Sequence, residues 1–297
     1  MKFKFIVRPP AKKEYQKEVL AFKKEFEVKE ELTEKEGERS AKNLAKKAIE
    51  EGFERIIVVS GDGSLNEVLN GLMEAKKGNF SSDFALGIIP TGAGNNFAKE
   101  LGIKNIKNAF SILRKNKKTL VDIGKVNERY FINCVSFGFD AQVNKIANDL
   151  KTKYPFLPRN LSYLFGAAGK IIIAIPNFEV KIEGEINFQG KSILAAITNT
   201  QSYGAIFKIN PGALFDDGKL NLCLITPLGR IRAFETLFRA TKGTHINLPE
   251  VKMLKFSFPI VISSPDFLPY ETDGEVPEPE KEYKISVFQK ILPILIP

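Results

Sequence analysis

Gly61-Asp62-Gly63-Ser64 is the stretch of this sequence whose residue types and spacing best fit a chemical task. Glycines let the backbone approach a ligand closely, and the N–H groups of a turn that opens a helix attract an anion such as phosphate. Asp62 would repel phosphate unless a cation lay between them, so the turn fits a Mg²⁺-bound nucleotide. An ordinary turn in which Asp62 caps a backbone amide explains the same residues equally well.

The flanking residues predict that this turn joins a buried strand to a helix. Ile56 to Val59 form a short β-branched run, and apolar residues from Leu65 to Met73 then recur at helical spacing. Ser64 followed by Glu67 has the form of a capping box, which places the start of the helix at Ser64.

A second glycine loop, Pro90-Thr91-Gly92-Ala93-Gly94-Asn95-Asn96, follows another apolar run over 84–89. Parallel strands that alternate with helices end at one edge of a sheet, where ligands bind. Neither loop has the Gly-Lys-Ser/Thr of a P-loop, and Phe97 stands where a dinucleotide fingerprint needs its third glycine. Two phosphate-competent turns at one edge favour a nucleotide site more than either turn does alone.

The strand and helix patterns predict an α/β protein of two domains. Residues 1–122 predict a Rossmann-like parallel-sheet domain that contains the Gly-Asp-Gly loop, and 123–288 predict a mostly antiparallel β-sandwich with helical insertions. Residues 289–297 form a tail that we expect to pack back on the first domain. Predicted strands are 3–7, 26–32, 56–59, 84–89, 121–126, 130–137, 178–182, 185–188, 192–198, 219–226, 252–262 and 282–289; predicted helices are 14–26, 37–51, 64–77, 97–101, 141–150, 161–175 and 230–241.

Composition excludes several classes of protein. His245 is the single histidine, which nearly excludes His-based triads and His-rich zinc sites. Cys134 and Cys223 lie in apolar runs and are expected to be buried thiols in a reducing compartment. The sequence shows no signal peptide or membrane span, so we expect a cytoplasmic protein. The net charge of +9 suits phosphate or anionic lipid, and without an aromatic-and-basic stretch we expect no nucleic acid partner.

Further short motifs follow the two loops in a specific order. The set is Gly61-Asp62-Gly63-Ser64 with Asn66-Glu67-Val68 and Asn70-Gly71, Pro90 to Asn95 with Phe97-Ala98, Val121-Asp122-Ile123-Gly124, Ser136-Phe137-Gly138-Phe139-Asp140-Ala141, Asp217-Gly218-Lys219-Leu220 and Asp273-Gly274-Glu275. In order and spacing they resemble the diacylglycerol kinase-like lipid kinases, which share a nucleotide-binding core with NAD kinases and sphingosine kinases. The resemblance runs nearly end to end. It implies ATP- and Mg²⁺-dependent phosphorylation of a lipid hydroxyl, diacylglycerol to phosphatidic acid, in a cleft between the two domains.

The resemblance also implies roles for individual residues. Glu275 is the implied proton acceptor, and Asp62 and Asp122 match acidic positions of the metal network. Implied contacts with ATP are Thr33, Ser60, Gly61, Asp62, Gly63, Ser64, Leu65, Asn66, Glu67, Gly92, Ala93 and Asn95. A second Mg²⁺ site that orders the β domain is implied at the main-chain carbonyls of Leu214 and Lys219 and the carboxylate of Asp217. By pattern alone, Glu275 fits a surface hairpin equally well, and Asp216-Asp217-Gly218 fits an ordinary turn.

Four departures from the family pattern affect the predicted site. Arg8-Pro9-Pro10 stands where members usually have Asn-Pro-x-Ser-Gly, and Ser60 replaces a glycine. Ala93 replaces a hydroxyl residue, which removes one hydrogen bond worth about 0.5–1.5 kcal/mol. Asn96 stands where many bacterial members have aspartate, so weaker Mg²⁺ binding or a different substrate preference is expected.

Three alternatives to a diacylglycerol kinase stay open. The acceptor could be sphingosine, ceramide or phosphatidylglycerol, the enzyme could be an NAD kinase or a sugar-phosphate kinase, or the chain could be a non-catalytic nucleotide- or lipid-sensing module. The pattern Asn66-Glu67-Val68 favours the lipid kinases over the NAD kinases. Retention of Glu275 argues against the sensing module, which needs no proton acceptor.

A lipid substrate implies peripheral contact with a membrane surface, and a homodimer is left open. Pro155-Phe156-Leu157-Pro158 is the best candidate for a membrane-touching loop. The apolar residues of the next helix could line an acyl-chain pocket, but most of them are expected to be core. They are Leu161, Leu164, Phe165, Ile171, Ile172, Ile173 and Ile175.

Overall fold

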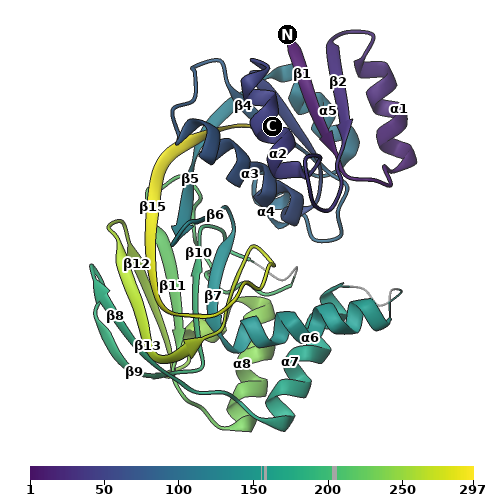
Figure 1. Ribbon diagram of the computed structural model, residues 1–297. Helices are drawn as coiled ribbons and strands as arrows, with labels where there is room; N and C mark the ends of the chain where they lie inside the picture. The colour runs from purple at the N-terminus through teal and green to yellow at the C-terminus, as the bar shows by residue number, and fades with distance from the viewer. Residues whose placement is uncertain (155, 157–158, 203–205) are drawn as a thin grey trace. The chain divides into compact units, whose positions relative to one another are not determined.

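A computed structural model describes residues 1–154, 156, 159–202 and 206–297 of the chain (Figure 1). The chain divides into two compact units. Unit 1 comprises Met1–Ile123 and Gln289–Pro297, and unit 2 comprises Gly124–Phe288. Pro155, Leu157 and Pro158 of the predicted membrane-touching loop lie outside the described residues.

The sheet of unit 1 is parallel, as predicted. Its strands lie in the order β2-β1-β3-β4, and the C-terminal end of β15 adds to β4 through the pairing of Ile294 with Leu86. Strand bounds are β1 Lys2–Val7, β2 Glu27–Leu32, β3 Arg55–Ser60, β4 Ala85–Pro90 and β15 Glu280–Leu295. The sheet is therefore the Rossmann-like element that the sequence indicated.

Helices cover both faces of this sheet. Successive side chains of β1 point to opposite faces, and the side chains on each face are buried by helices. The Phe5 ring packs against Phe22 of α1 and Phe110 of α5. Lys4, on the other face, is buried and donates a hydrogen bond to Glu51, which follows the last residue of α2. Helix α2 in turn packs against α3. Helix bounds are α1 Lys13–Phe22, α2 Ala41–Glu50, α3 Asp62–Lys76, α4 Asn96–Glu100 and α5 Ile106–Lys115.

Unit 2 is an antiparallel β-sandwich, which confirms the second half of the predicted fold. One sheet joins β15 to β13, β8 and β9, and the other has the order β12-β11-β10-β7-β14. Side chains of both sheets, such as Phe137, Leu222 and Ile262, share one buried core. Strand bounds are β5 Lys118–Val126, β6 Arg129–Phe131, β7 Cys134–Gly138, β8 Phe178–Gly184, β9 Phe188–Ser192, β10 Leu194–Thr198, β11 Leu220–Ile225, β12 Val251–Phe256, β13 Ile260–Leu268 and β14 Tyr270–Thr272.

Three helices cover the outer face of the second sheet: α6 Phe139–Lys153, α7 Arg159–Ile173 and α8 Arg230–Lys242, with the short 3₁₀ helix η1 at His245–Asn247. Figure 1 shows α6, α7 and α8 together beside β7, β10 and β11. Ala196 and Cys223 point toward these helices and share a cluster with Val143 and Tyr163. Among the described residues, no helix is both long enough and apolar enough to span a bilayer.

Several predicted elements were wrong in detail. The stretch 185–187 is a turn between β8 and β9, and the Glu185 carboxylate in it accepts the N–H groups of Ser257 and Phe258. The predicted strand 252–262 is divided at this contact into β12 and β13. The hairpin predicted over 121–137 consists only of β5 and β6, since β7 pairs with β10 in the other sheet. Helix α5 has no counterpart among the predicted elements.

Candidate functional site

The two glycine loops touch each other at Gly61 and Gly92. They follow the adjacent strands β3 and β4, whose register pairs Ser60 with Pro90. A Cβ placed on Gly92 would lie 2.4 Å from Cα of Gly61, far closer than such atoms approach in proteins. Gly92 is therefore required for the two loops to pack, whatever ligand they hold.

Asp62 joins these loops through its carboxylate. Its Oδ2 accepts the backbone N–H of Asn96 at 2.9 Å, and its Oδ1 accepts that of Phe97 at 3.2 Å. These N–H groups open α4, so Asp62 caps that helix from the first turn of α3. A Cβ on Gly94 would lie 2.9 Å from Asp62 Oδ2, which explains the second glycine of the second loop. The capping alternative for Asp62 is thus realised in the structure.

The start of α3 corrects the predicted capping box. The helix begins at Asp62, and its N-cap residue is Gly61, which has no side chain to cap the first N–H groups. Ser64 lies within the first turn, buried, and its Oγ is 2.9 Å from that of Ser60. The capping-box pattern predicted Gly61-Asp62-Gly63 as a turn, whereas in the structure Asp62 and Gly63 belong to the first turn of α3. Leaving aside the chain neighbours of Gly63 and the backbone of α3, no atom of the described residues lies within 4 Å of a Cβ built on Gly63, so this side of the turn is open.

Arg8 lies against the same first turn of α3, which the sequence did not predict. Its Nη1 donates to Ser64 Oγ at 3.1 Å and lies 4.0 Å from Glu67 Oε1. The Arg8 side chain is half-exposed. The altered segment Arg8-Pro9-Pro10 therefore places a cation beside the glycine turn. A basic residue directly after the first strand of a parallel sheet was the signal in the sequence that could have predicted this contact.

The other predicted nucleotide contacts divide into exposed and buried groups. Ala93 is exposed, and Asn95 has the left-handed backbone (φ 53°) with its Nδ2 donating to Gly92 O at 2.8 Å. Asn95 Oδ1 is buried and has no hydrogen-bond partner among the described residues. Leu65 is a core residue, which leaves only its main chain for a ligand.

Asn66 and Thr33 are buried as well. The Asn66 side chain accepts from Asn70 Nδ2 at 3.1 Å along α3. Thr33 follows β2 directly, and its N–H donates to Val7 O at 2.9 Å. Thr33 thus lies at the same carboxyl edge of the sheet as the glycine loops.

Asp122 binds the returning C-terminal segment. It is fully buried in β5, and its Oδ1 accepts the N–H of Lys290 at 2.7 Å. Lys290 has a left-handed backbone (φ 48°), so the chain bends there before the end of β15 pairs with β4. In the structure Asp122 therefore positions the tail 289–297, which belongs to unit 1.

In unit 2, Asp273-Gly274-Glu275 forms a tight hairpin. Asp273 and Gly274 both have positive φ (47° and 91°), and Thr272 and Glu275 exchange two backbone hydrogen bonds of 2.8 and 3.0 Å. An Asp-Gly pair is the preferred sequence for such a two-residue turn. Glu275 is half-exposed at its end, with Arg129 Nη1 3.3 Å from Glu275 Oε2.

The carboxylate of Asp273 holds this hairpin in place. It accepts the backbone N–H groups of Ile132, Asn133 and Cys134, each at 2.9 Å. Burial of these groups makes the loss of that carboxylate costly. The turn therefore presents Glu275 from a rigid support, and Arg129 is a neighbour of the predicted proton acceptor that sequence reasoning missed.

The turn before β11 holds the residues of the second predicted metal site. Asp217 Oδ1 accepts the N–H of Lys219 at 3.1 Å, and its Oδ2 lies 3.7 Å from Lys255 Nζ. Leu214 is exposed. Among the described residues, no group of three or more His, Cys, Asp and Glu side chains is arranged to hold a metal. A site of one carboxylate and main-chain carbonyls does not need such a group, so this site stays a prediction.

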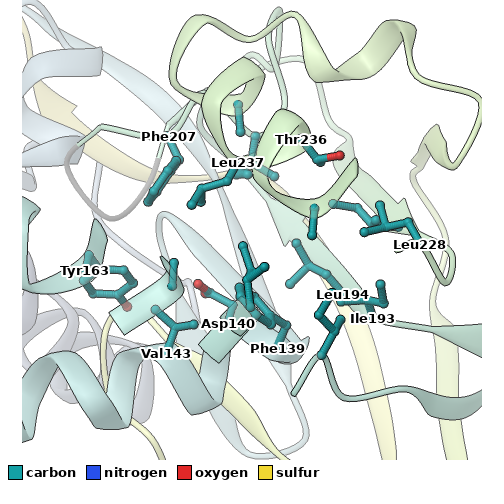
Figure 2. A pocket seen from close by; sticks show the side chains of 17 residues that line it. Phe139, Asp140, Val143, Tyr163, Ile193, Leu194, Phe207, Leu228, Thr236 and Leu237 are labelled. Carbon is teal, nitrogen blue, oxygen red and sulfur yellow. The ribbon is translucent and has the colours of Figure 1, made fainter. Parts of the chain in front are cut away.

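An apolar cavity lies in unit 2 beneath the helices (Figure 2). Side chains from α6, α7, α8, β10 and β11 line it. Of its 17 lining residues only Asp140, Tyr163 and Thr236 carry polar side-chain atoms, and Asp140 is the one carboxylate. Figure 2 shows Asp140 among the apolar side chains that meet there. The cavity, of about 80 Å³, is thus suited to a short apolar group beside one polar wall.

The predicted acyl-chain residues divide between this cavity and the surface. Ile171 and Ile175 line the cavity. Leu161, Phe165, Ile172 and Ile173 are exposed, so the expectation that most of these residues are core was wrong. Helix α7 is apolar on more than one side, and burial of one side leaves the other in solvent.

Comparisons with known proteins identify the family. The diacylglycerol kinase catalytic domain matches residues 3–126, and the YegS C-terminal NAD kinase beta sandwich-like domain matches 133–296. A diacylglycerol kinase of Staphylococcus carnosus is 32% identical over 254 residues, which cover 84% of this chain and 78% of the relative. The chain belongs to the diacylglycerol kinase family.

Other members and solved structures agree with this membership. A diacylglycerol kinase of Staphylococcus aureus is 31% identical over 252 residues, covering 84% of this chain and 76% of the relative. The crystal structure of a diacylglycerol kinase from Bacillus anthracis has a TM-score of 0.73 at 21% identity and covers 100% of this chain and 97% of that one. An NAD kinase from Archaeoglobus fulgidus, solved in complex with ATP, has a TM-score of 0.56 at 11% identity and covers 99% and 93%. These structures show the fold; the sequence relatives show that the chain is a member of a kinase family.

Proposed function

We propose that this protein is an ATP- and Mg²⁺-dependent lipid kinase that transfers the γ-phosphoryl group to a lipid hydroxyl, with diacylglycerol as acceptor and phosphatidic acid as product. The observation that carries the lipid acceptor is the apolar cavity of unit 2, because its lining has one carboxylate among mostly apolar side chains. A soluble, fully polar acceptor such as NAD⁺ would find few partners there.

The glycine turn of unit 1 supports nucleotide binding. The open side at Gly63, the uncapped start of α3 and the Arg8 guanidinium together offer N–H groups and a positive charge to phosphate. The residues present therefore fit a nucleoside triphosphate.

Two sets of oxygen atoms would hold Mg²⁺. Asp62 and Asp122 are the carboxylates of the first set, and the carboxylate of Asp217 with the main-chain oxygens of Leu214 and Lys219 is the second. When bound, the ion offsets the negative charge of the phosphates. Asp62 and Asp122 each already accept backbone N–H groups, which orient their carboxylates.

Glu275 is the proposed proton acceptor. In the transfer, the acceptor hydroxyl oxygen forms a bond to the γ-phosphorus, the bond to the β-phosphate oxygen breaks, and ADP leaves. The hydroxyl proton passes to Glu275, whose turn is fixed by Asp273. Arg129 Nη1 lies 3.3 Å from Glu275 Oε2, and both side chains are about half-exposed.

Contact with a membrane is proposed at the exposed apolar side chains of α7 and α8. These two helices pack together and expose Leu161, Phe165, Ile172, Ile173, Ile231, Phe234 and Phe238. The cations Lys170, Arg230, Arg239 and Lys242 lie on the same helices. Apolar side chains with interspersed cations suit an anionic lipid surface, and both helices line the apolar cavity.

The decisive experiment is transfer of label from γ-labelled ATP to lipids in detergent micelles with Mg²⁺. Label on diacylglycerol is the expected result. Label on sphingosine, ceramide or phosphatidylglycerol instead would keep the reaction and change the acceptor. Label on NAD⁺ alone would make the chain an NAD kinase, and ATP binding without transfer to any acceptor would favour a sensing module.

A further inference from the structure

Glu271, a residue outside the predicted site, is buried beside the turn that carries Glu275. It lies in β14 opposite Ser136 of β7 and is only 1% exposed. Its Oε2 accepts the N–H of Gly274 at 2.9 Å and Asn144 Nδ2 at 3.1 Å. A fully buried carboxyl group that binds the middle of the Asp273-Gly274-Glu275 turn is in a position to set its conformation.

The other oxygen of Glu271 shares a hydroxyl group with Asp140. Ser136 Oγ lies 3.2 Å from Glu271 Oε1 and 2.7 Å from Asp140 Oδ2. A serine hydroxyl has one proton to donate, and two ionised carboxylates can only accept. Both contacts are hydrogen bonds only when one of the two carboxyl groups carries a proton. Asp140 also lines the apolar cavity, so this bridge connects the cavity to the turn.

The surroundings place that proton on Glu271. Burial, followed by the charges of Asp140 on α6 and Asp273 on the turn, raises the pKa of Glu271 to about 8, against an opposing contribution from the Gly274 N–H. The Cys134 thiol of β7 lies 3.5 Å from Glu271 Oε1. Its burial holds its pKa well above the usual value, so the thiol stays protonated and adds no negative charge. Among the described residues, Ser136 and Asn144, whose side chains bond to Glu271, are neutral.

We propose that Glu271 acts as a neutral carboxylic acid that positions the Asp273-Gly274-Glu275 turn, donating its proton to Ser136 Oγ while Ser136 donates to Asp140. Its carbonyl oxygen accepts from Gly274 at the same time, so one side chain joins the cavity-lining carboxylate to the proposed proton acceptor. This role rests on the proposed function of Glu275, but the protonation of Glu271 does not. When the proton leaves, Ser136 Oγ can donate to only one of the two carboxylates, and the buried charges of Glu271, Asp140 and Asp273 repel one another, so one support of the turn is lost.

The substitution Glu271→Gln tests the proposal, because an amide reproduces the neutral acid: its N–H₂ donates to Ser136 and its oxygen accepts from Gly274. Lipid phosphorylation by Glu271→Gln should stay within about threefold of the wild-type rate at pH 7, whereas Glu271→Ala should lose most of its turnover with little change in the KM for ATP. Wild-type turnover should fall as pH rises through 8, approaching about tenfold per pH unit, and Glu271→Gln should not show this fall. An inactive but folded Glu271→Gln would show that an ionised carboxylate is needed and would overturn the proposal.

A stability measurement separates this inference from the proposed kinase activity. The folded pKa of Glu271 lies above that of an unfolded glutamate, so between pH about 4.5 and 8 the native state binds more protons and its stability falls as pH rises. Tm of Glu271→Gln minus Tm of wild type should therefore grow from pH 5 to 8 and then level off. Parallel Tm curves would contradict a protonated Glu271. If the predicted Tm difference were observed but the protein phosphorylated no lipid, the protonation of Glu271 would be supported and the proposed kinase function would be rejected.

Wild-type protein gives an independent check if Glu271→Gln does not fold. Infrared spectroscopy should show the carbonyl band of a protonated carboxylic acid at pH 7, and the band should disappear above pH about 9. Ser136→Ala, which removes the bridging hydroxyl, should shift that band. A wild-type spectrum with no such band at pH 7 would overturn the assignment.

Discussion

The carboxylate of Asp62 accepts the backbone N–H of Asn96 at 2.9 Å, so the acid of the first glycine loop caps the helix that follows the second. The same carboxylate is the one proposed to face Mg²⁺-bound phosphate. A single residue thus fixes the distance between two phosphate-competent turns and supplies negative charge between them. Its hydrogen bonds orient it for the proposed role without using all of its lone pairs.

Replacement of Asp62 should therefore affect both stability and activity. Asp62→Ala removes a cap and is expected to lower the free energy of unfolding by about 1–2 kcal/mol, measured by urea titration, while phosphorylation is lost. Asp62→Asn keeps one acceptor oxygen and should recover most of the stability but little of the activity. Full activity in Asp62→Asn would contradict a role for its charge.

Arg8, which bonds to Ser64 in the first turn of α3, is predicted to bind the nucleotide phosphates. Arg8→Asn should raise the KM for ATP about tenfold, the cost of one charge-assisted hydrogen bond, and should leave turnover at saturating ATP nearly unchanged. Arg39→Ala, which removes an exposed arginine of the same unit, is the matched control. An unchanged KM in Arg8→Asn would show that Arg8 only supports Ser64.

Glu275→Gln should depress turnover by about 10²- to 10⁴-fold, because it removes the proton acceptor. The amide keeps the size of the side chain, and the hairpin is held by Asp273, so the fold and the affinity for ATP should not change. Isothermal titration with ATP and a lipid phosphorylation assay measure the two effects separately. Wild-type turnover in this variant would remove Glu275 from the mechanism.

The exposed apolar side chains of α7 and α8 are predicted to bind anionic membranes. Phe238→Glu should weaken sedimentation with vesicles of phosphatidylcholine and phosphatidylglycerol and leave phosphorylation of short-chain lipid in micelles intact. Phe258 is equally exposed, at 70% against 65% for Phe238, but lies between β12 and β13, so Phe258→Glu is the control. Equal loss of vesicle binding in both variants would show that these helices are not the docking surface.

Widening or filling the apolar cavity should change the preference for acyl chains. Ala167 lines the cavity and is buried, so Ala167→Leu takes up space that a chain would occupy. The KM for a long-chain diacylglycerol should rise more than that for a short-chain one, measured in the same micelles. Equal changes for both lipids would indicate that the acyl chain binds elsewhere.

The sequence was informative where local patterns decide the structure. β-branched runs predicted β3 and β4, and the alternation of strands and helices predicted that both glycine loops follow them at one edge of the sheet. It was misleading at Ser64, where a capping-box pattern occurs inside a helix that begins two residues earlier because the strand feeds it directly. Burial of one face of α7 could be predicted from periodicity, but the exposure of Phe165 depends on which neighbours pack against it.

Long-range pairings in the site had no local signal. Nothing near Asp62 in the sequence indicates that Asn96, 34 residues away, is its partner, and nothing near Asp122 indicates Lys290. Glu271 was overlooked because a glutamate in a short strand resembles a solvent-exposed residue until β7 and α6 are seen to cover it. Such residues become visible only when distant segments are brought together.

The most direct test of the proposed function is transfer of label from γ-labelled ATP to diacylglycerol in mixed micelles with Mg²⁺, with Glu275→Gln as the matched control. We predict labelled phosphatidic acid from the wild-type protein and about 10²-fold less or lower from the variant. Failure of an intact, ATP-binding protein to phosphorylate diacylglycerol or any other lipid hydroxyl would contradict the assignment as a lipid kinase.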